Sequence, residues 1–279
     1  MSTSYEIHPS VKMTQPVYEV IGDANWNSWN KIARLIKHMT WRSLASRYKG
    51  SALGFLWTLV NPIMLMFVYT FVFKIIFQQK AAGVPFEVYL MTGILAWNFF
   101  STAAIQASVS LVSGASLVNK STFPRIVLPV SAVLANAVNY LVALPLLFAF
   151  IFVSGVRPTF AIFLLPFAFL LLTVIAIGLG ALLASLMPFF QDLQHLIEVF
   201  FTMWLFLTPI VYDISLIPER WRSWYALNPM VGIVEFIHTV FLGQPLHEKS
   251  LGISLVGTLG ILLIGLLIFR RLAPHCTEV

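Results

Sequence analysis

Residues 160–186, FAIFLLPFAFLLLTVIAIGLGALLASL, decide the fold class, because no charged side chain occurs among them. An α-helix needs about 20 mostly apolar residues to cross the ~30 Å hydrocarbon core of a bilayer, and this stretch is longer. Backbone polar groups in hydrocarbon must bond within the protein, which leaves helices or closed barrels. The stretch is apolar on every side and does not alternate in polarity as barrel strands do. It therefore predicts a transmembrane helix in an all-α integral membrane protein.

Five further stretches of the chain are long and apolar enough to cross a membrane. Of the 279 residues, 59% are hydrophobic and only 10% are charged, against about 25% charged in soluble domains. A water-soluble globule is therefore excluded. The fifth span is interrupted only by His195 and Glu198 near one end. The six expected transmembrane helices cover residues 53–77, 88–113, 126–153, 160–187, 193–212 and 251–269.

The positions of Lys and Arg predict the orientation of these spans. Eleven basic residues fall on one side, in the head before residue 50, the connection 114–125 and the tail after residue 269, and six fall on the other side. Because loops rich in Lys and Arg stay in the cytoplasm, both termini are expected to be cytoplasmic. The net charge of +6 then reflects topology and anionic lipid. No nucleic-acid partner is expected, because no basic patch interleaved with aromatic residues forms a separate module.

The head of the chain predicts an amphipathic helix that lies in the membrane interface, with its cations toward water and lipid headgroups. One face of residues 29–44 carries Trp29, Ile32, Ala33, Ile36, Met39 and Leu44, and the opposite face carries Lys31, Arg34, His38 and Arg42. The chain is accordingly expected to have three parts. These are a flexible cytoplasmic N-terminus at 1–27, an amphipathic interface helix at 28–49 and a six-span membrane domain at 50–279.

Residues 213–250, between the fifth and sixth spans, predict one or two re-entrant or interfacial helices on the outer face. The semi-apolar part of this segment, residues 230–242, is too short and too polar for a span and carries Glu235 and His238. Aromatic residues favour the headgroup level of a membrane. The segment is therefore expected to be held at that depth by Trp221, Trp224 and Tyr225.

The sequence lacks the common motifs of nucleotide-binding and hydrolytic sites. No Gly-x-x-x-x-Gly-Lys-Ser/Thr loop and no Gly-x-Ser-x-Gly elbow occurs, so any ATP-driven work must come from a partner. Two pairs, His195 with Glu198 and Glu235 with His238, have the spacing of carboxylate-bridged metal sites. The spans offer almost no further ligands, so both pairs are interpreted as solvated residues at span ends and no metal is expected. Glu198 remains a candidate for function or for an interhelical contact.

Aromatic residues are frequent, with 24 Phe, 8 Trp and 8 Tyr. Many belong to the interfacial belt or face lipid and neighbouring helices. Two groups on the first and fifth spans are also candidates to line a path for sugar rings, whose C–H surfaces suit aromatic faces. These residues are Tyr69, Phe73, Phe77, Phe201, Trp204 and Tyr212.

Several motifs together resemble a known family. Residues 47–57 (RYKGSALGFLW) lead to Asn61-Pro62, and residues 117–120 (LVNK) run into 123–125 (FPR) and Leu128-Pro129. Further matching motifs are DL at 192–193, TPIVY at 208–212, IPE at 217–219 and NP at 228–229. Over about residues 30–270 the chain resembles the membrane permease subunits of bacterial ABC exporters of lipid-linked O-antigen, capsule polymers and teichoic acids. One departure is Gln191, where family members often have Arg.

The resemblance implies a non-enzymatic transport subunit of the bacterial inner membrane. It implies a homodimer with two cytoplasmic ATP-binding cassette subunits, which would bind ATP and Mg²⁺, and no cofactor in this chain. The connection 114–125 would dock on the ATPase, with Asn119, Lys120, Phe123 and Arg125 as candidates. The first and fifth spans would border the polymer channel, and residues 213–250 would form its periplasmic gate. Arg47 and Lys49 would either meet the lipid diphosphate at the inner mouth or act only as positive-inside anchors.

The expected function is therefore ATP-driven export of a lipid-linked polysaccharide, most readily O-antigen. Teichoic acid, capsule polymer and small hydrophobic molecules remain alternatives, because the same architecture serves them. An integral glycosyl or acyl transferase is a further alternative. It would need catalytic groups on adjoining loops, where only Asp213, Glu219, Glu235 and His238 are available.

Overall fold

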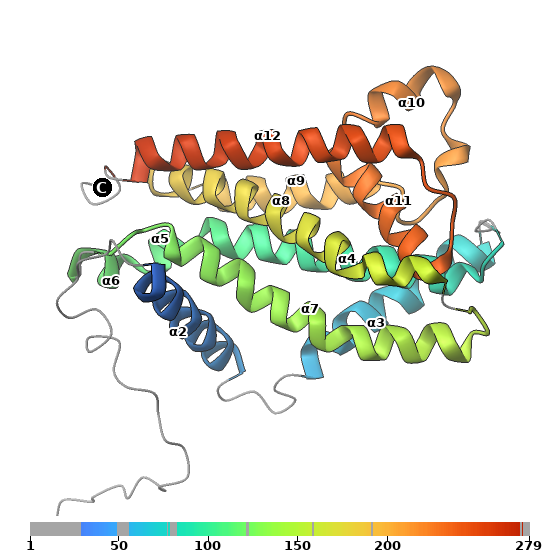
Figure 1. The fold of residues 1–279 in the computed structure, drawn as a ribbon, viewed down its shortest axis with the longest axis horizontal. Helices are drawn as coiled ribbons and strands as arrows, with labels where there is room; N and C mark the ends of the chain where they lie inside the picture. Colours follow the sequence, from blue (N-terminus) through green and yellow to red (C-terminus); the bar gives the residue numbers. More distant parts are fainter. Residues whose placement is uncertain are drawn as a thin grey trace, which may run out of the picture.

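The computed structural model describes residues 29–48, 56–76, 78, 83–120, 123–157, 159–190, 192–273 and 275. Every secondary-structure element in these ranges is a helix, which confirms the all-α prediction. The longest of them lie side by side in one bundle, with α4 between α7 and α8 and with α12 along α8 (Figure 1). The short helices α5 (Ser110–Ser113) and α6 (Ala115–Lys120) lie at one end of this bundle, and α10 (Glu219–Tyr225) lies at the other.

Four of the described helical stretches are long and apolar enough to cross a membrane. They are α4 (Phe86–Ser108), α7 (Val127–Val153), the stretch Phe160–Phe189 and α12 (Glu248–Leu272). The third comprises η3 (Phe160–Leu164), α8 (Leu165–Leu186) and η4 (Met187–Phe189). These four helices coincide with the second, third, fourth and sixth spans expected from the sequence.

The regions expected to form the first and fifth spans are helical but less regular. Helix α3 (Trp57–Tyr69) continues as the π-helical segment η2 (Thr70–Ile76). Helix α9 (Leu193–Phe206) has 14 residues, which correspond to about 21 Å at 1.5 Å per residue. It ends shortly before Pro209, whose ring cannot continue the hydrogen-bond ladder. Both elements are thus present where expected. Helix α9, taken without the residues that follow it, is shorter than the hydrocarbon core.

Glycine and alanine residues set the spacing between the long helices. A Cβ atom on Gly178 would lie 2.6 Å from the Cα of Leu262, and one on Gly265 would overlap the carbonyl oxygen of Gly178. A Cβ atom on Gly180 would lie 2.6 Å from the Cβ of Ala107. Small residues let helix backbones approach closely in membranes, where packing replaces the hydrophobic effect. This close contact makes Gly180 of α8 a packing residue.

Helix α2 (Trp29–Tyr48) lies across α7 near the α6 end of the bundle (Figure 1). Leu35 and Met39 of α2 are buried against a small apolar cluster that includes Phe123 and Phe269. Trp29, expected on the apolar face, is 82% exposed. Leu35 lies outside the set of apolar positions expected from the helical wheel. The amphipathic helix therefore exists, with a buried face rotated slightly toward Leu35.

The segment between α9 and α12 forms two helices of different character. After the short turn η5 (Ile214–Leu216), α10 presents Trp221 and Trp224 on the surface. Helix α11 (Pro229–Leu242) is packed among α4, α8 and α12, and its Glu235 and His238 are 9% and 3% exposed. The interpretation of Glu235 and His238 as solvated residues is therefore wrong. The neighbouring helices cover nearly all of α11, including the positions of Glu235 and His238.

Candidate functional site

A polar groove of about 380 Å³ lies between α2, α4, α5 and α7. Arg47, near the end of α2, donates to Asn136 Oδ1 on α7 at 3.0 Å and also to Gln106 Oε1 on α4. The side chain of Asn136 in turn donates to Gln106 Oε1 at 2.9 Å and to the carbonyl of Ala132 at 2.8 Å. One guanidinium and two amides thus join three helices at one point.

Hydroxyl groups and a second arginine complete the lining of this groove. Ser110 and Ser131 donate to carbonyls three residues earlier in the chain, at 2.6 and 2.8 Å. Their oxygen lone pairs can still accept hydrogen bonds. Arg42 is exposed at the rim. The groove therefore combines positive charge with hydroxyl groups, which suits a phosphate group. The remaining lining residues are Met39, Ser43, Ser46, Val109, Ser113, Gly114, Leu117, Leu128 and Ala132.

Two side chains of the connection 114–125, those of Phe123 and Arg125, make contacts within the chain. Phe123 is 8% exposed and packs in the apolar cluster with Leu35 and Val127. Arg125 donates to the carbonyl of Ala273, the residue that follows α12. Asn119 and Lys120 belong to α6, and their side chains lie outside the described part of the chain. Phe123 and Arg125 therefore attach the end of this connection to the apolar cluster and to the end of α12.

The aromatic residues expected on the fifth span divide between the core and a hollow. Phe201 is 2% exposed, and its ring lies 5.5 Å from that of Phe100 and 6.3 Å from that of Trp97. Trp204 is half-buried and lines a hollow of about 740 Å³ between α9 and α10, together with Tyr212. Phe201 therefore packs in the core against the ring of Trp204, and Trp204 and Tyr212 line the hollow.

Hydrogen bonds hold the rim of this hollow in place. Trp204 Nε1 donates to Asn228 Oδ1 at 2.9 Å, and Asn228 Nδ2 donates to the carbonyl of Leu207 at 2.9 Å. The Tyr212 hydroxyl bonds with the Tyr225 hydroxyl and donates to the carbonyl of Phe206 at 2.7 Å. The end of α9 and the region around α10 are thus coupled through polar tips of aromatic side chains.

Other expected site residues fall where the structure describes no side chain. Tyr69 lies in α3 and Phe73 in η2, but the description covers only their backbone. Phe77 and Lys49 lie outside the described residues. The proposed roles of these residues stay predictions.

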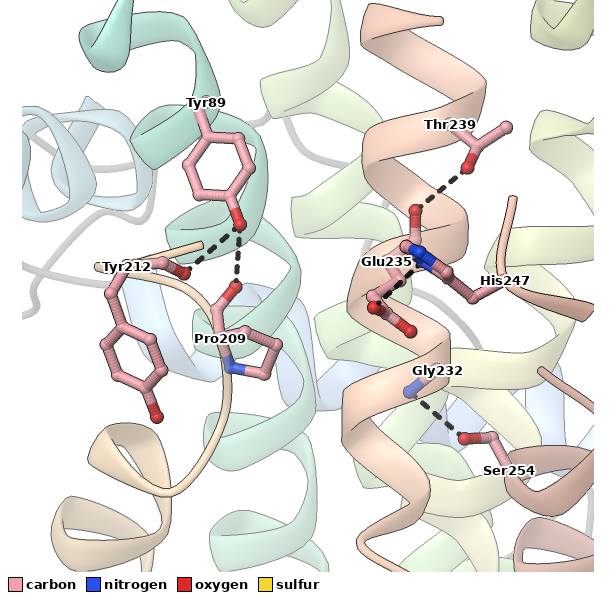
Figure 2. A network of polar contacts seen from close by, with 8 residues as sticks. All are labelled: Tyr89, Pro209, Tyr212, Gly232, Glu235, Thr239, His247 and Ser254. Carbon is pink, nitrogen blue, oxygen red and sulfur yellow. Dashed lines mark hydrogen bonds and ion pairs between the residues drawn. The ribbon is translucent and has the colours of Figure 1, made fainter. Parts of the chain in front are cut away.

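A second polar network, which the sequence motifs did not reveal, lies around the turn after α9 (Figure 2). Figure 2 shows the Tyr89 hydroxyl pointing at the carbonyls of Pro209 and Tyr212, each at 3.2 Å. The ring of His238 stacks on that of Tyr89 with 3.8 Å between ring centroids. Glu235, also on α11, has its Oε1 atom 3.2 Å from Nδ1 of His247, the residue that precedes α12. Two sequence signals touched this cluster, the spacing of Glu235 and His238 and the TPIVY motif that contains Pro209 and Tyr212.

Residues 34–242 match the family described as ABC-2 type transporter. The chain belongs to the ABC-2 type transporter family. The matched region of this ABC-2 chain runs from α2 to the end of α11, so it includes the polar groove, the connection 114–125 and the aromatic hollow.

Three relatives show which kinds of transport protein this chain is similar to. The chain is 34% identical to the O-antigen export system permease protein RfbA of Myxococcus xanthus, over 77% of this chain and 83% of the relative. It is 27% identical to the RfbA permease of Klebsiella pneumoniae, over 88% of this chain and 94% of the relative. It is 23% identical to the polysialic acid transport protein KpsM of Escherichia coli, over 82% and 90%. The family resemblance inferred from the motifs is confirmed.

Proposed function

We propose that this chain is the permease subunit of an ATP-driven exporter that moves lipid-linked O-antigen out of the cytoplasm. The observation that carries the proposal is the likeness to O-antigen export permeases along nearly their whole length, up to 94% of the relative. Capsule polymer is the second candidate, because KpsM and the capsule export protein CtrC of Neisseria meningitidis are also similar, at 23% and 24% identity.

The proposed topology has six crossings of the bacterial inner membrane, with both termini in the cytoplasm. Helices α4, α7 and α12 and the stretch Phe160–Phe189 supply four. The α3–η2 segment and α9 supply the others. Exposed apolar side chains on both elements suit a place at membrane depth, against a second copy of the chain or lipid. These include Phe67, Phe71, Ile75, Val199, Phe200 and Met203. The turn residues 207–212 would complete the crossing that begins with α9, because a helix of 14 residues, about 21 Å long, is shorter than the hydrocarbon core.

A homodimer with two cytoplasmic ATP-binding subunits is the proposed working unit. The exposed faces of α3 and α9 would meet those of a second copy, so that the channel forms between the two chains. Tyr69, Phe73, Phe77, Trp204 and Tyr212 would border it, with Phe201 behind them. The gate would be formed by α10 and α11, on the periplasmic side.

The ATP-binding partners would dock on α6, and they would hold ATP and Mg²⁺, so that this chain needs no cofactor. Asn119 and Lys120 would contribute the contact surface. Phe123 and Arg125 would hold that surface against the bundle, because both side chains bond or pack within this chain. Arg47 and Lys49 would meet the lipid diphosphate beside the polar groove.

Export in cells tests the proposal directly. The gene is deleted in its host, and surface polysaccharide is measured together with lipid-linked polymer in the cytoplasmic membrane. We expect surface O-antigen to disappear and the lipid-linked polymer to accumulate inside, and a plasmid copy should restore export. Normal surface polymer in the deletion strain would contradict the proposal. Loss of polymer synthesis without accumulation would favour the transferase alternative.

A further inference from the structure

A second groove, of about 440 Å³, lies between the start of α7 and the last turns of α12. The last turns of α12, which line it, lie at the end of the bundle that carries α5 and α6 (Figure 1). Four of the lining residues are apolar and two are arginines. The lining residues are Arg125, Ile126, Leu266, Phe269, Arg270 and Ala273.

The two arginines stand at the edge of an otherwise apolar groove. Arg125 donates to the carbonyl of Ala273, which holds its guanidinium over the end of α12. Arg270 is exposed and belongs to the last turn of α12. No carboxylate lines the groove among the described residues. The positive charge at this edge therefore has no compensating acidic group in the lining, and an anion would complement it.

An apolar stripe on α12 leads to Arg270. Leu263 and Leu267 are 60% and 58% exposed, and they precede Arg270 by seven and three residues. That spacing places all three on one helix face. Val256 and Leu259, 73% and 55% exposed, continue the stripe toward the other end of α12. The stripe therefore offers apolar surface along several turns, ending at a guanidinium.

We propose that this groove binds one anionic phospholipid. The phosphate group accepts hydrogen bonds from Arg270 and Arg125, and an acyl chain lies along the stripe through Leu267 and Leu263. Basic pockets between transmembrane helices are suited to anionic headgroups. A cytoplasmic protein does not fit the whole surface, because the stripe continues into the hydrocarbon layer. The proposed lipid lies behind the connection 114–125 and would hold its end against α12.

Native mass spectrometry of the purified exporter tests this site, with the chain and its ATP-binding partner kept together. The complex is titrated with phosphatidylglycerol or phosphatidylcholine, and bound lipid is counted. A basic residue near the headgroups contributes about 1 kcal/mol to anionic lipid binding, or about fivefold in affinity. We therefore expect Arg270→Gln to weaken phosphatidylglycerol binding about fivefold and to leave phosphatidylcholine unchanged. Arg271→Gln is the matched control, because Arg271 is the next residue of α12 and does not line the groove.

Two further variants separate the phosphate contact from general effects on folding. Arg270→Lys keeps the charge and should retain most of the binding. Leu267→Asn keeps both arginines, interrupts the stripe, and should also weaken phosphatidylglycerol binding. Equal losses in Arg270→Gln and Arg271→Gln would overturn the proposal, because they would indicate a diffuse surface charge. Unchanged lipid binding in Arg270→Gln with loss of the ATP-binding subunit would identify the groove as a protein contact instead. Neither result depends on which polymer is exported.

Discussion

Arg47 and Asn136 are joined by a hydrogen bond of 3.0 Å across 89 positions of sequence. The bond ties the end of α2 to α7, and Gln106 of α4 accepts from both side chains. Helix α2 is thereby attached to two helices that are long and apolar enough to cross a membrane. Movement of α2 would pull on the same point of α4 and α7. Under the proposed function, a substrate bound in the groove beside this contact would act on all three helices.

Arg47→Met should destabilise this attachment. It would leave the amide groups of Asn136 and Gln106 without their guanidinium partner, and an unsatisfied buried polar group costs about 1–3 kcal/mol. We expect a lower Tm of the detergent-solubilised complex and faster hydrogen exchange in α2. Arg42→Met serves as the control, because Arg42 lines the same groove but is exposed. Equal Tm values for the two variants would contradict the role of the Arg47 contact.

Lys120→Glu should abolish co-purification of the ATP-binding subunit while the chain itself stays folded. The reason is that α6 carries Lys120 at its end, where a reversed charge would meet the partner. Arg125→Gln should keep the partner but loosen the end of α12, because its side chain bonds to the carbonyl of Ala273. Pull-down from membranes measures the first effect. Normal recovery of the partner with Lys120→Glu would exclude α6 as the docking element.

Trp204→Ala should reduce polymer export while assembly continues. The substitution removes an aromatic wall of the hollow and leaves Asn228 Oδ1 without its indole donor. Lipid-linked polymer should then accumulate in the cytoplasmic membrane, which gel electrophoresis of extracted glycolipid can measure. Phe152→Ala is the control, since Phe152 is 80% exposed on α7 and does not line the hollow. An unchanged export rate in Trp204→Ala would remove the aromatic path.

Gly265→Ala should weaken the packing of α12 on α8. The added methyl group would overlap the carbonyl oxygen of Gly178, and overpacking of this kind typically costs about 1–3 kcal/mol. Gly260→Ala is matched to it on the same helix, because a Cβ atom at Gly260 would meet nothing within 4 Å. Thermal unfolding in detergent compares the two variants. A Tm loss in Gly260→Ala as large as that in Gly265→Ala would contradict the close approach.

The apolar stretches predicted the long helices well, because a bilayer demands a minimum length of apolar helix whatever packs around it. The bounds of α7, Val127–Val153, lie within one residue of the expected third span. The fifth span was harder to bound. The sequence predicted helix up to Tyr212, but α9 ends at Phe206, and the apolar residues that follow form turns around Pro209. Apolar character alone does not distinguish these conformations.

For the candidate site as well, the sequence predicted some residues and missed the contacts that they make. The sequence singled out Arg47 and Arg125, but not their bonding partners Asn136 and Ala273. It marked Trp204 and Asn228 separately, without indicating the hydrogen bond between them. The misassigned pair Glu235 and His238 illustrates the reason. Two ionisable residues on a short helix suggest a solvated surface, and only the packing of α11 among α4, α8 and α12 buries them.

The sequence by itself determined that this chain is an α-helical membrane protein of the ABC-2 type transporter family, and where its four long spans lie. These properties depend on local composition and motif order. The tertiary structure decided which of the few charges face inward and what they contact. Arg125 and Ala273 are 148 positions apart, and such a contact is set by how whole helices pack, which no local pattern encodes.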